Sequence, residues 1–173
     1  MRYAKWTLIA LAVAFVAGFV HWSLPSRDIV RIVDTEIRRS DMTGTVEGRE
    51  VVRTQDVRFI AAVTPSGSPR VYRNQDTGFG WPPFFKFDSA NLAARAQDVI
   101  SSEDDPRWMI VTHYGWRIPM ISAFPNAVSV RPATGPEETL IPWLNMALLA
   151  LLAVVAFVLW RRVRRFLHRR RAA

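Results

Sequence analysis

Two clusters of aromatic, basic and hydroxyl-bearing residues are the parts of this sequence whose types and spacing fit a binding site. The first lies around two glycines and two prolines at residues 76–89, and the second lies around Gly115. Together they supply seven candidate binding residues: Trp81, Phe84, Phe85, Lys86, Tyr114, Trp116 and Arg117. Aromatic rings and arginine provide much of the binding energy at interfaces, and arginine also holds anionic groups. The clusters therefore suit a ligand or a partner protein.

The aromatic segment at residues 76–89 also has a structural interpretation, which we favour from the sequence. In this interpretation five rings close one end of a small domain: Phe79, Trp81, Phe84, Phe85 and Phe87. The alternative is that part of the segment faces outward, where its rings form a pocket wall or enter membrane headgroups. For Arg117 we expect an internal ion pair with Asp76 or Asp88.

Three patterns resemble catalytic motifs, but they do not make a coherent catalytic set. Asp76-Thr-Gly78 matches the aspartic-protease triplet, yet no second copy is present, so a turn is the better interpretation. Lys86 and Ser89 fit a Ser-Lys pair, although Ser89 is better explained as a helix cap. An envelope hydrolase is the alternative, and it requires four side chains to converge: Asp76, Asp88, Ser89 and His113. We predict that the protein is not an enzyme.

Cysteine and histidine usage narrows the chemistry further. The chain has no cysteine, and His113 is the only histidine between residues 25 and 139. A disulfide framework, a thiolate nucleophile and a multi-histidine metal site are therefore excluded for that region. The acidic run at residues 103–105 is expected to be a solvated turn. We predict no metal and no cofactor.

Two apolar segments flank the region that carries these clusters. Residues 6–24 form the first, since nineteen residues of helix rise about 28 Å, close to the thickness of a hydrocarbon core. Residues 140–160 form the second, which holds no charge and is bracketed by Trp143 and Trp160. A signal peptide is the alternative for the first segment and a buried core helix for the second. We predict two transmembrane helices.

The distribution of charge predicts the orientation of these helices. Residues 25–139 contain 14 basic and 15 acidic side chains, so the whole basic excess lies at the termini. Basic residues close to a span stay in the cytoplasm. We therefore expect a multi-pass protein of the bacterial inner membrane, with both termini cytoplasmic and the central region periplasmic.

The basic C-terminal tail is expected to contact anionic lipids of the bilayer. Its candidate membrane-surface residues are seven arginines: Arg161, Arg162, Arg164, Arg165, Arg169, Arg170 and Arg171. Each basic side chain near an anionic surface contributes about 1 kcal/mol of attraction. A plain stop-transfer signal is the alternative. The sequence pI of about 11.1 comes from the termini, so we predict no nucleic-acid partner.

Alternating hydrophobicity predicts a β-rich exported domain. The expected strands lie at residues 28–38, 51–63, 70–74, 107–118 and 127–131, with a helix at 89–100. On the second strand we expect one face to be buried, and it carries Val57, Phe59, Ala61 and Val63. Three strands, a helix and two strands is the element order of the OB-fold, a five-stranded barrel. Another small α+β or sandwich arrangement stays open.

The predicted fold class is thus membrane α+β, in which two transmembrane helices flank an OB-like barrel with one helix. The expected segments are a cytoplasmic N-terminus at 1–5, a transmembrane helix at 6–24, an exported domain at 25–139, a second transmembrane helix at 140–160 and a basic cytoplasmic tail at 161–173.

Several long phrases in the exported region resemble a known family. They are Val71-Tyr-Arg-Asn-Gln-Asp-Thr-Gly78, Trp81-Pro-Pro-Phe-Phe-Lys-Phe-Asp-Ser-Ala-Asn-Leu92 and Tyr114-Gly-Trp-Arg-Ile-Pro119. The sequence is similar to an uncharacterised family of proteobacterial membrane proteins that is catalogued as a domain of unknown function. The resemblance implies a membrane protein and transfers no activity, cofactor or catalytic residue.

The function expected from the sequence is that of a non-enzymatic, membrane-anchored envelope module. Small side chains recur along both spans and would let them pack closely: Ala10, Ala14 and Gly18, then Ala147, Ala150, Ala153 and Ala156. Such a module would contact other envelope or membrane proteins and stabilise a complex. The alternative is a periplasmic ligand- or lipid-binding domain, for which Trp81 and Trp116 must line one concave site.

Overall fold

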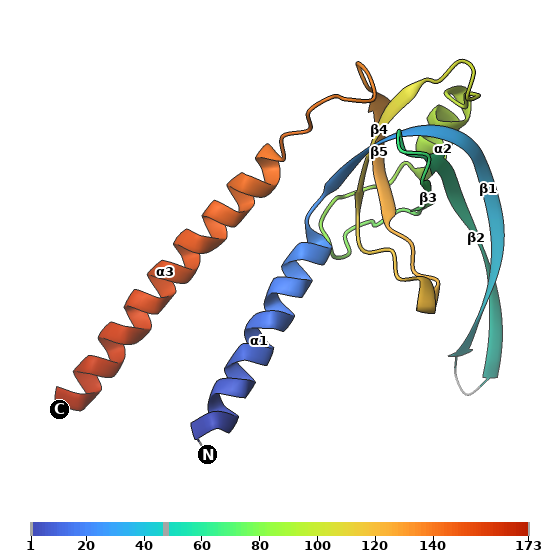
Figure 1. Cartoon of the computed structure of the whole chain (residues 1–173). Helices are drawn as coiled ribbons and strands as arrows, with labels where there is room; N and C mark the ends of the chain where they lie inside the picture. Colours follow the sequence, from blue (N-terminus) through green and yellow to red (C-terminus); the bar gives the residue numbers. More distant parts are fainter. Residues whose placement is uncertain (1, 47–48, 173) are drawn as a thin grey trace. The chain divides into compact units, whose positions relative to one another are not determined.

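Five strands close into a barrel in the order β1-β2-β3-β5-β4 (Figure 1). The structure is a computed structural model, and it describes residues 2–46 and 49–172. The strands are β1 Ser26–Val46, β2 Arg49–Val63, β3 Pro69–Asn74, β4 Trp108–Tyr114 and β5 Asn126–Pro132. Neighbours pair antiparallel except β3 and β5, which pair parallel. With the helix α2 (Ser89–Asp98) between β3 and β4, the predicted five-stranded barrel with one helix is confirmed.

The barrel core combines side chains from all five strands with one face of α2. Leu92 and Ala96 are four residues apart on α2, so they share the face that is buried against the strands. The buried core cluster consists of Val30, Ile32, Ile60, Ala62, Tyr72, Leu92, Ala96, Met109, Val111, Ala127 and Val130.

The predicted inward face of the second strand is wrong over most of its length. Among the described side chains of β2, Ile60 and Ala62 are buried, whereas Phe59, Ala61 and Val63 of the expected face are only half-buried. Both alternating sets in this strand are apolar, so period two alone does not tell which set faces the core. Val57 is buried as expected.

Strand β4 ends at Tyr114, earlier than the alternation predicts. Gly115 follows with a φ of 89°, a left-handed conformation that glycine adopts readily and other residues rarely do. The Gly115 amide donates a hydrogen bond of 3.0 Å to the carbonyl oxygen of Trp22. The chain therefore turns out of the barrel wall where it meets the end of the first helix.

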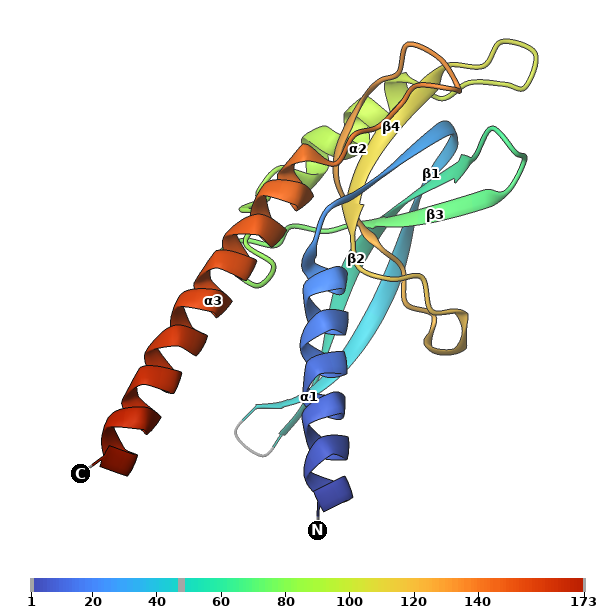
Figure 2. The same ribbon diagram turned by 60° about the vertical axis from the view of Figure 1, so that its left-hand side comes forward.

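That first helix, α1 (Arg2–Ser23), runs directly into β1 (Figure 2). Its segment Trp6–Ser23 has a mean hydropathy of 1.7, and none of it is buried inside the structure. A helix so apolar and so uncovered is long enough to cross a membrane.

Residues after Glu138 form a second compact unit, made of the helix α3 (Trp143–Ala172) and the segment that precedes it. The part from Trp143 to Arg162 has a mean hydropathy of 2.3 and is likewise long and apolar enough to cross a membrane. The helix continues without a break through the basic tail. There the Arg164 guanidinium lies 5.3 Å from the Trp160 ring centroid. The side chains of Arg169, Arg170 and Arg171 lie outside the described part of the structure.

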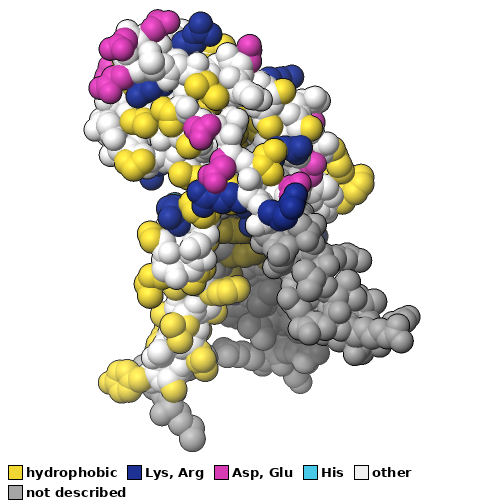
Figure 3. Space-filling view, turned by 90° about the vertical axis from the view of Figure 1, so that its right-hand side faces the viewer, with side chains coloured by type: hydrophobic (Ala, Val, Ile, Leu, Met, Phe, Trp, Pro, Cys, Tyr) yellow, Lys and Arg dark blue, Asp and Glu magenta, His cyan; other side chains and the backbone are white. Residues whose placement is uncertain are grey.

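Acidic and basic side chains are interspersed over the barrel face that Figure 3 presents. This fits the nearly balanced charge of residues 25–139. In the same view several Lys or Arg side chains gather at the lower edge of the barrel. Because Figure 3 differs from Figure 1 only by a turn about the vertical axis, this is the edge from which α1 leaves.

Candidate functional site

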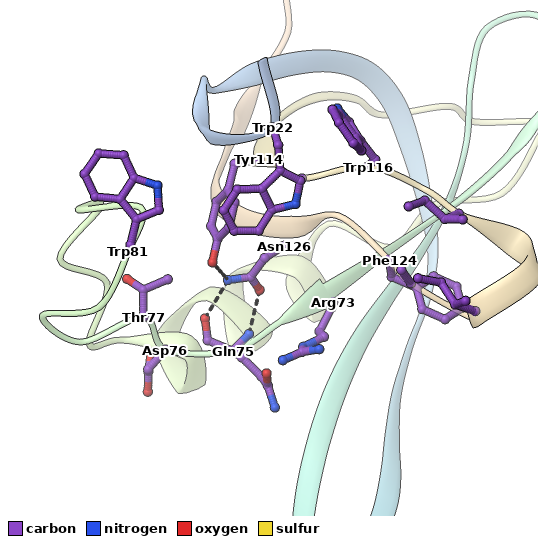
Figure 4. Close-up of a pocket in the computed structure, with 14 residues that line it drawn as sticks. Trp22, Arg73, Gln75, Asp76, Thr77, Trp81, Tyr114, Trp116, Phe124 and Asn126 are labelled. Atoms are coloured by element: carbon purple, nitrogen blue, oxygen red, sulfur yellow. Dashed lines mark hydrogen bonds between the residues drawn. The ribbon is translucent and has the colours of Figure 1, made fainter. Parts of the chain in front are cut away.

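An aromatic cavity of about 590 Å³ lies where α1 joins the barrel (Figure 4). Its aromatic walls come from the helix end, the loop before α2, the end of β4 and the loop that follows β4: Trp22, Trp81, Tyr114, Trp116 and Phe124. Its polar wall comes from the end of β3, the residues that follow it and the start of β5: Arg73, Gln75, Asp76, Thr77 and Asn126. The volume is in the range of small-molecule sites, which are typically apolar with a few placed polar groups.

The end of α1 is fixed against the barrel by its tryptophan. Trp22 meets Tyr114 edge to face, with ring centroids 5.8 Å apart. One turn earlier, Gly18 lies next to the Trp116 ring, and a Cβ added there would be 3.6 Å from it, an ordinary contact distance. The small-residue line predicted for the first span therefore meets a barrel loop at Gly18.

Two further tryptophans reach from the loops to the helix end. The Trp81 indole donates a 2.8 Å hydrogen bond to the Ser23 hydroxyl, and its ring stacks on Phe19. The Trp116 indole donates a 2.8 Å hydrogen bond to Nδ1 of His21. Trp81 is 60% exposed and Trp116 is 40% exposed, so neither ring lies in a closed core. They line one concave site, as the ligand-binding hypothesis requires.

Asn126 connects residues of the polar wall through the hydrogen bonds of its side chain. Its amide group donates to the Gln75 carbonyl at 3.0 Å and to the Tyr114 hydroxyl at 3.1 Å, while its oxygen accepts from the Gln75 backbone amide. The side chain of Arg73 lies beside Gln75 (Figure 4). Within the described residues, the Arg73 guanidinium makes no hydrogen bond or ion pair. The cavity thus combines aromatic walls with a cation that is available to an anionic group.

A buried lysine holds the loop that carries Trp81. Lys86 is 4% exposed, and its ammonium group donates to the Asn74 side-chain oxygen and, at 2.7 Å, to the Ala127 carbonyl. Burial lowers the pKa of Lys86 to about 8, against a partial upward effect of Asp76 and Asp88. The Lys86 carbonyl also accepts the backbone amides of Thr77 and Gly78. Lys86 therefore positions the loop from behind and does not line the cavity.

Asp76 is at the edge of the cavity, and its carboxylate completes the start of α2 (Figure 4). Its carboxylate accepts the Ser89 backbone amide at 2.8 Å and the Ser89 hydroxyl at 3.0 Å. The expected role of Ser89 as a helix cap is wrong, because neither Asp88 nor Ser89 caps α2 with its own side chain. A carboxylate at a helix start satisfies free amides and complements the helix dipole, so Asp76 has a structural role here.

The predicted binding residues thus separate into different places. Trp81, Tyr114 and Trp116 line the cavity, and Phe84 stacks on Tyr114 with ring centroids 4.9 Å apart. Phe85 is exposed. Whether these residues bind a ligand stays a prediction.

Two expectations about the loops are wrong. The rings before α2 do not close one end of the barrel, since four of the five are more than half exposed: Phe79, Trp81, Phe85 and Phe87. Arg117 does not pair with Asp76 or Asp88. Its guanidinium donates to the Ala123 carbonyl and lies 4.1 Å from the Phe124 ring centroid, within its own loop.

A second polar cluster, which the sequence did not predict, joins three strands beside a cavity of about 260 Å³. The Tyr72 hydroxyl donates to Asp28 at 2.7 Å, and Nε2 of His113 lies 3.1 Å from the same oxygen. Burial raises the pKa of Tyr72, so its hydroxyl stays a donor. For Asp28, burial acts to raise the pKa, but the hydrogen bonds from His113 and Tyr72 outweigh it and lower the pKa.

The four side chains of the hydrolase alternative do not meet in one set. Ser89 pairs with Asp76 at the start of α2, whereas His113 pairs with Asp28 at a different cavity. Among the described residues, no group of three or more His, Cys, Asp or Glu side chains is placed to hold a metal ion.

Comparison with known proteins agrees with the family resemblance of the sequence. A family model described as protein of unknown function (DUF1523) matches residues 1–167. A relative from Haemophilus influenzae, described as an uncharacterized protein, is 33% identical over 148 residues, which are 83% of each chain. No solved structure matches this chain. The chain therefore belongs to the DUF1523 family.

Proposed function

We propose that this protein is a membrane-anchored module that binds an anionic phospholipid in the aromatic cavity beside α1. One observation carries the proposal: Trp22 of an apolar, uncovered helix lines the same cavity as Trp81 and Trp116 of the barrel loops. If α1 crosses a bilayer, its C-terminal end lies at the membrane interface, and so does the cavity.

The lining chemistry favours an amphiphile over a purely polar ligand. Tryptophan and tyrosine concentrate at membrane interfaces because one part of each ring is apolar and the other part forms hydrogen bonds. Arg73 adds a positive charge without an internal partner among the described residues, and guanidinium groups bind phosphate well. A phospholipid headgroup with the adjoining part of its chains satisfies both features.

The orientation follows from the charge distribution. The two spans are α1 and the apolar part of α3, with both termini in the cytoplasm and the barrel in the periplasm of a bacterial inner membrane. The arginines that follow residue 160 then lie at the anionic cytoplasmic leaflet. Contact with other envelope proteins was the first expectation from the sequence; the lining of the cavity favours lipid binding instead.

The barrel is of the OB-like type in this proposal. Its strand order and the helix between β3 and β4 support that assignment. One type of fold hosts many unrelated functions, so the barrel by itself does not select a ligand.

Native mass spectrometry of the purified full chain tests the proposal. The protein would be extracted in mild detergent, supplied with phosphatidylglycerol and compared with its Arg73→Gln and Trp116→Ala variants. Arg107→Gln is the matched control, because Arg107 is exposed near the acidic turn. A lost charge-assisted hydrogen bond of about 1.5–3 kcal/mol predicts a roughly tenfold or greater loss of the lipid-bound fraction for Arg73→Gln. Equal lipid binding by Arg73→Gln and Arg107→Gln would overturn the proposal.

A further inference from the structure

The barrel exposes further large apolar side chains on two loops beside the cavity, one of which, Ile121, also lines it. The loop before α2 presents Phe79 at 86%, Phe85 at 57% and Phe87 at 57% exposure. The loop after β4, which contains the short helix η1 (Pro119–Ile121), presents Met120 at 96% and Ile121 at 71% exposure. We name these five residues the apolar rim. Large apolar side chains grouped in this way mark an interaction surface.

The exposure of the rim is built into the backbone of both loops. Phe85 has a φ of 48° and Ser122, directly after Ile121, has a φ of 49°. Non-glycine residues rarely adopt this left-handed conformation, because it is strained. Between Phe85 and Phe87, the side chain of Lys86 points inward and is hydrogen bonded there. The two phenylalanines are therefore held outward by a fixed loop.

The phenylalanines form one cluster. Phe79 meets Phe87 with ring centroids 5.2 Å apart and Phe85 with centroids 6.1 Å apart, both edge to face. The cluster packs its rings against each other and still leaves more than half of each residue uncovered. Such a surface has apolar area to bury against a partner.

Both loops lie at the end of the barrel from which α1 leaves. The first is tied to the helix end through Trp81, which contacts Phe19 and Ser23. Figures 1 and 2 both show the loop with η1 extending on the side toward which α1 runs. In both views the loop between α2 and β4, which contains Asp104, lies at the opposite end.

We infer that the apolar rim enters the headgroup region of the bilayer that α1 crosses and seats the barrel on the membrane surface. The inference rests on the membrane anchor of the proposed function but not on lipid binding in the cavity. At this depth the aromatic, methionine and isoleucine side chains of the rim leave water and contact lipid. The basic side chains at the same edge of the barrel (Figure 3) would then lie near anionic headgroups.

The absence of cysteine from the chain allows a direct test with single-cysteine variants. Phe79→Cys and Met120→Cys report the rim, Asp104→Cys reports the far end, and Phe15→Cys reports α1. Each full-length variant would carry an environment-sensitive fluorophore in nanodiscs of phosphatidylethanolamine and phosphatidylglycerol. Quenching by nitroxide-labelled lipid is then compared with quenching by aqueous iodide. Because Met120 is almost fully exposed, labelling at this position does not disturb packing.

The expected result is a ratio of lipid to aqueous quenching above one at positions 15, 79 and 120 and below one at position 104. If position 15 is quenched by lipid while 79 and 120 are quenched by iodide, the rim inference is wrong and the anchor holds. If position 15 is quenched by iodide, the anchor and the rim inference both fail. Labels at 79 and 120 that are shielded from both quenchers would indicate that the rim packs against protein, such as a second copy of this chain, and would overturn the inference.

Discussion

Lys86 shows how single residues of the aromatic loop act through partners far away in the sequence. Its ammonium group connects the loop to Asn74 on β3 and to the Ala127 carbonyl on β5. A lysine in this position stabilises the loop geometry and leaves the cavity lining to the aromatic residues. The sequence marks Lys86 as unusual but does not reveal which groups its side chain contacts.

Substituting Lys86 by methionine should destabilise the barrel. Lys86→Met keeps most of the apolar stem but removes the ammonium donor to two buried oxygens, on Asn74 and Ala127. Each unsatisfied buried group costs about 1–3 kcal/mol, so we expect the free energy of unfolding to fall by at least about 1 kcal/mol. Urea unfolding of the detergent-solubilised chain, followed by tryptophan fluorescence, measures this. Arg95→Met, at an exposed site on α2, is the control and should change little.

The same lysine predicts a dependence of stability on alkaline pH. Its pKa is about 8 in the folded state, below the ordinary value of 10.5, so the unfolded chain binds more protons between these values. The free energy of unfolding therefore rises with pH across this window. We expect the wild type to gain stability relative to Lys86→Met as pH rises from about 8 toward 10.5. A difference between the two proteins that is independent of pH would contradict the pKa of Lys86.

Asp28 gives a prediction for how the stability of the fold depends on acidic pH. Its pKa is held below 3.8 by His113 and Tyr72 despite burial, so its ionised form stabilises the fold. This contribution is complete above that pH and is lost as pH falls through the lower, folded-state pKa. Asp28→Asn should consequently cost stability at neutral pH, and the cost should shrink in acid. The urea midpoints of both proteins, measured from pH 6 down to about pH 3, test this.

Contacts of this kind, between residues far apart in the sequence, could not be predicted from the sequence. Asp28 lies 44 positions from Tyr72 and 85 from His113, so no local pattern relates them. Asp76 likewise completes a helix that starts 13 residues later. Residue type identified Trp81, Tyr114 and Trp116 as candidates because their chemistry is unusual, and folding brought them to one cavity.

At the scale of elements, strands and helices were predicted well because they depend on local periodicity. All five strands and α2 occur in the expected order, although β1 extends to Val46, well beyond its expected end at residue 38, and β4 ends early. The buried faces were harder to predict, since runs such as residues 59–63 are apolar at every position. The end of β4 depends on Gly115, whose contact with Trp22 joins segments far apart in the sequence.

That junction gives a prediction about the coupling of α1 to the barrel. Gly115→Ala adds a side chain at a residue whose φ is 89°, which costs about 1–2 kcal/mol of backbone strain. The added carbon would lie 3.5 Å from the Trp22 indole nitrogen, so strain and not collision dominates. We expect a matching drop in the free energy of unfolding. Gly135→Ala, where nothing lies within 4 Å, should change it by less than about 0.5 kcal/mol.

Over the whole molecule, two apolar helices and a nearly neutral barrel account for the composition. The barrel carries the cavity and the apolar rim next to α1 and the acidic turn at residues 103–105 at the far end, while β1 and β2 also extend on the side of α1 (Figure 1). This asymmetry has a simple physical origin if one end faces lipid and the other faces water. The charge count could predict an orientation from the sequence alone, whereas the positions of the aromatic loops could be found only from the folded structure.

The most direct test of the account is the side of the membrane on which the barrel lies. In intact bacterial cells that express the Asp104→Cys variant, a membrane-impermeant maleimide should label position 104. A matched Ala173→Cys variant should be labelled only after the membrane is disrupted. Labelling of both positions only after disruption would contradict the periplasmic barrel, and with it the proposed site at the outer surface of the membrane.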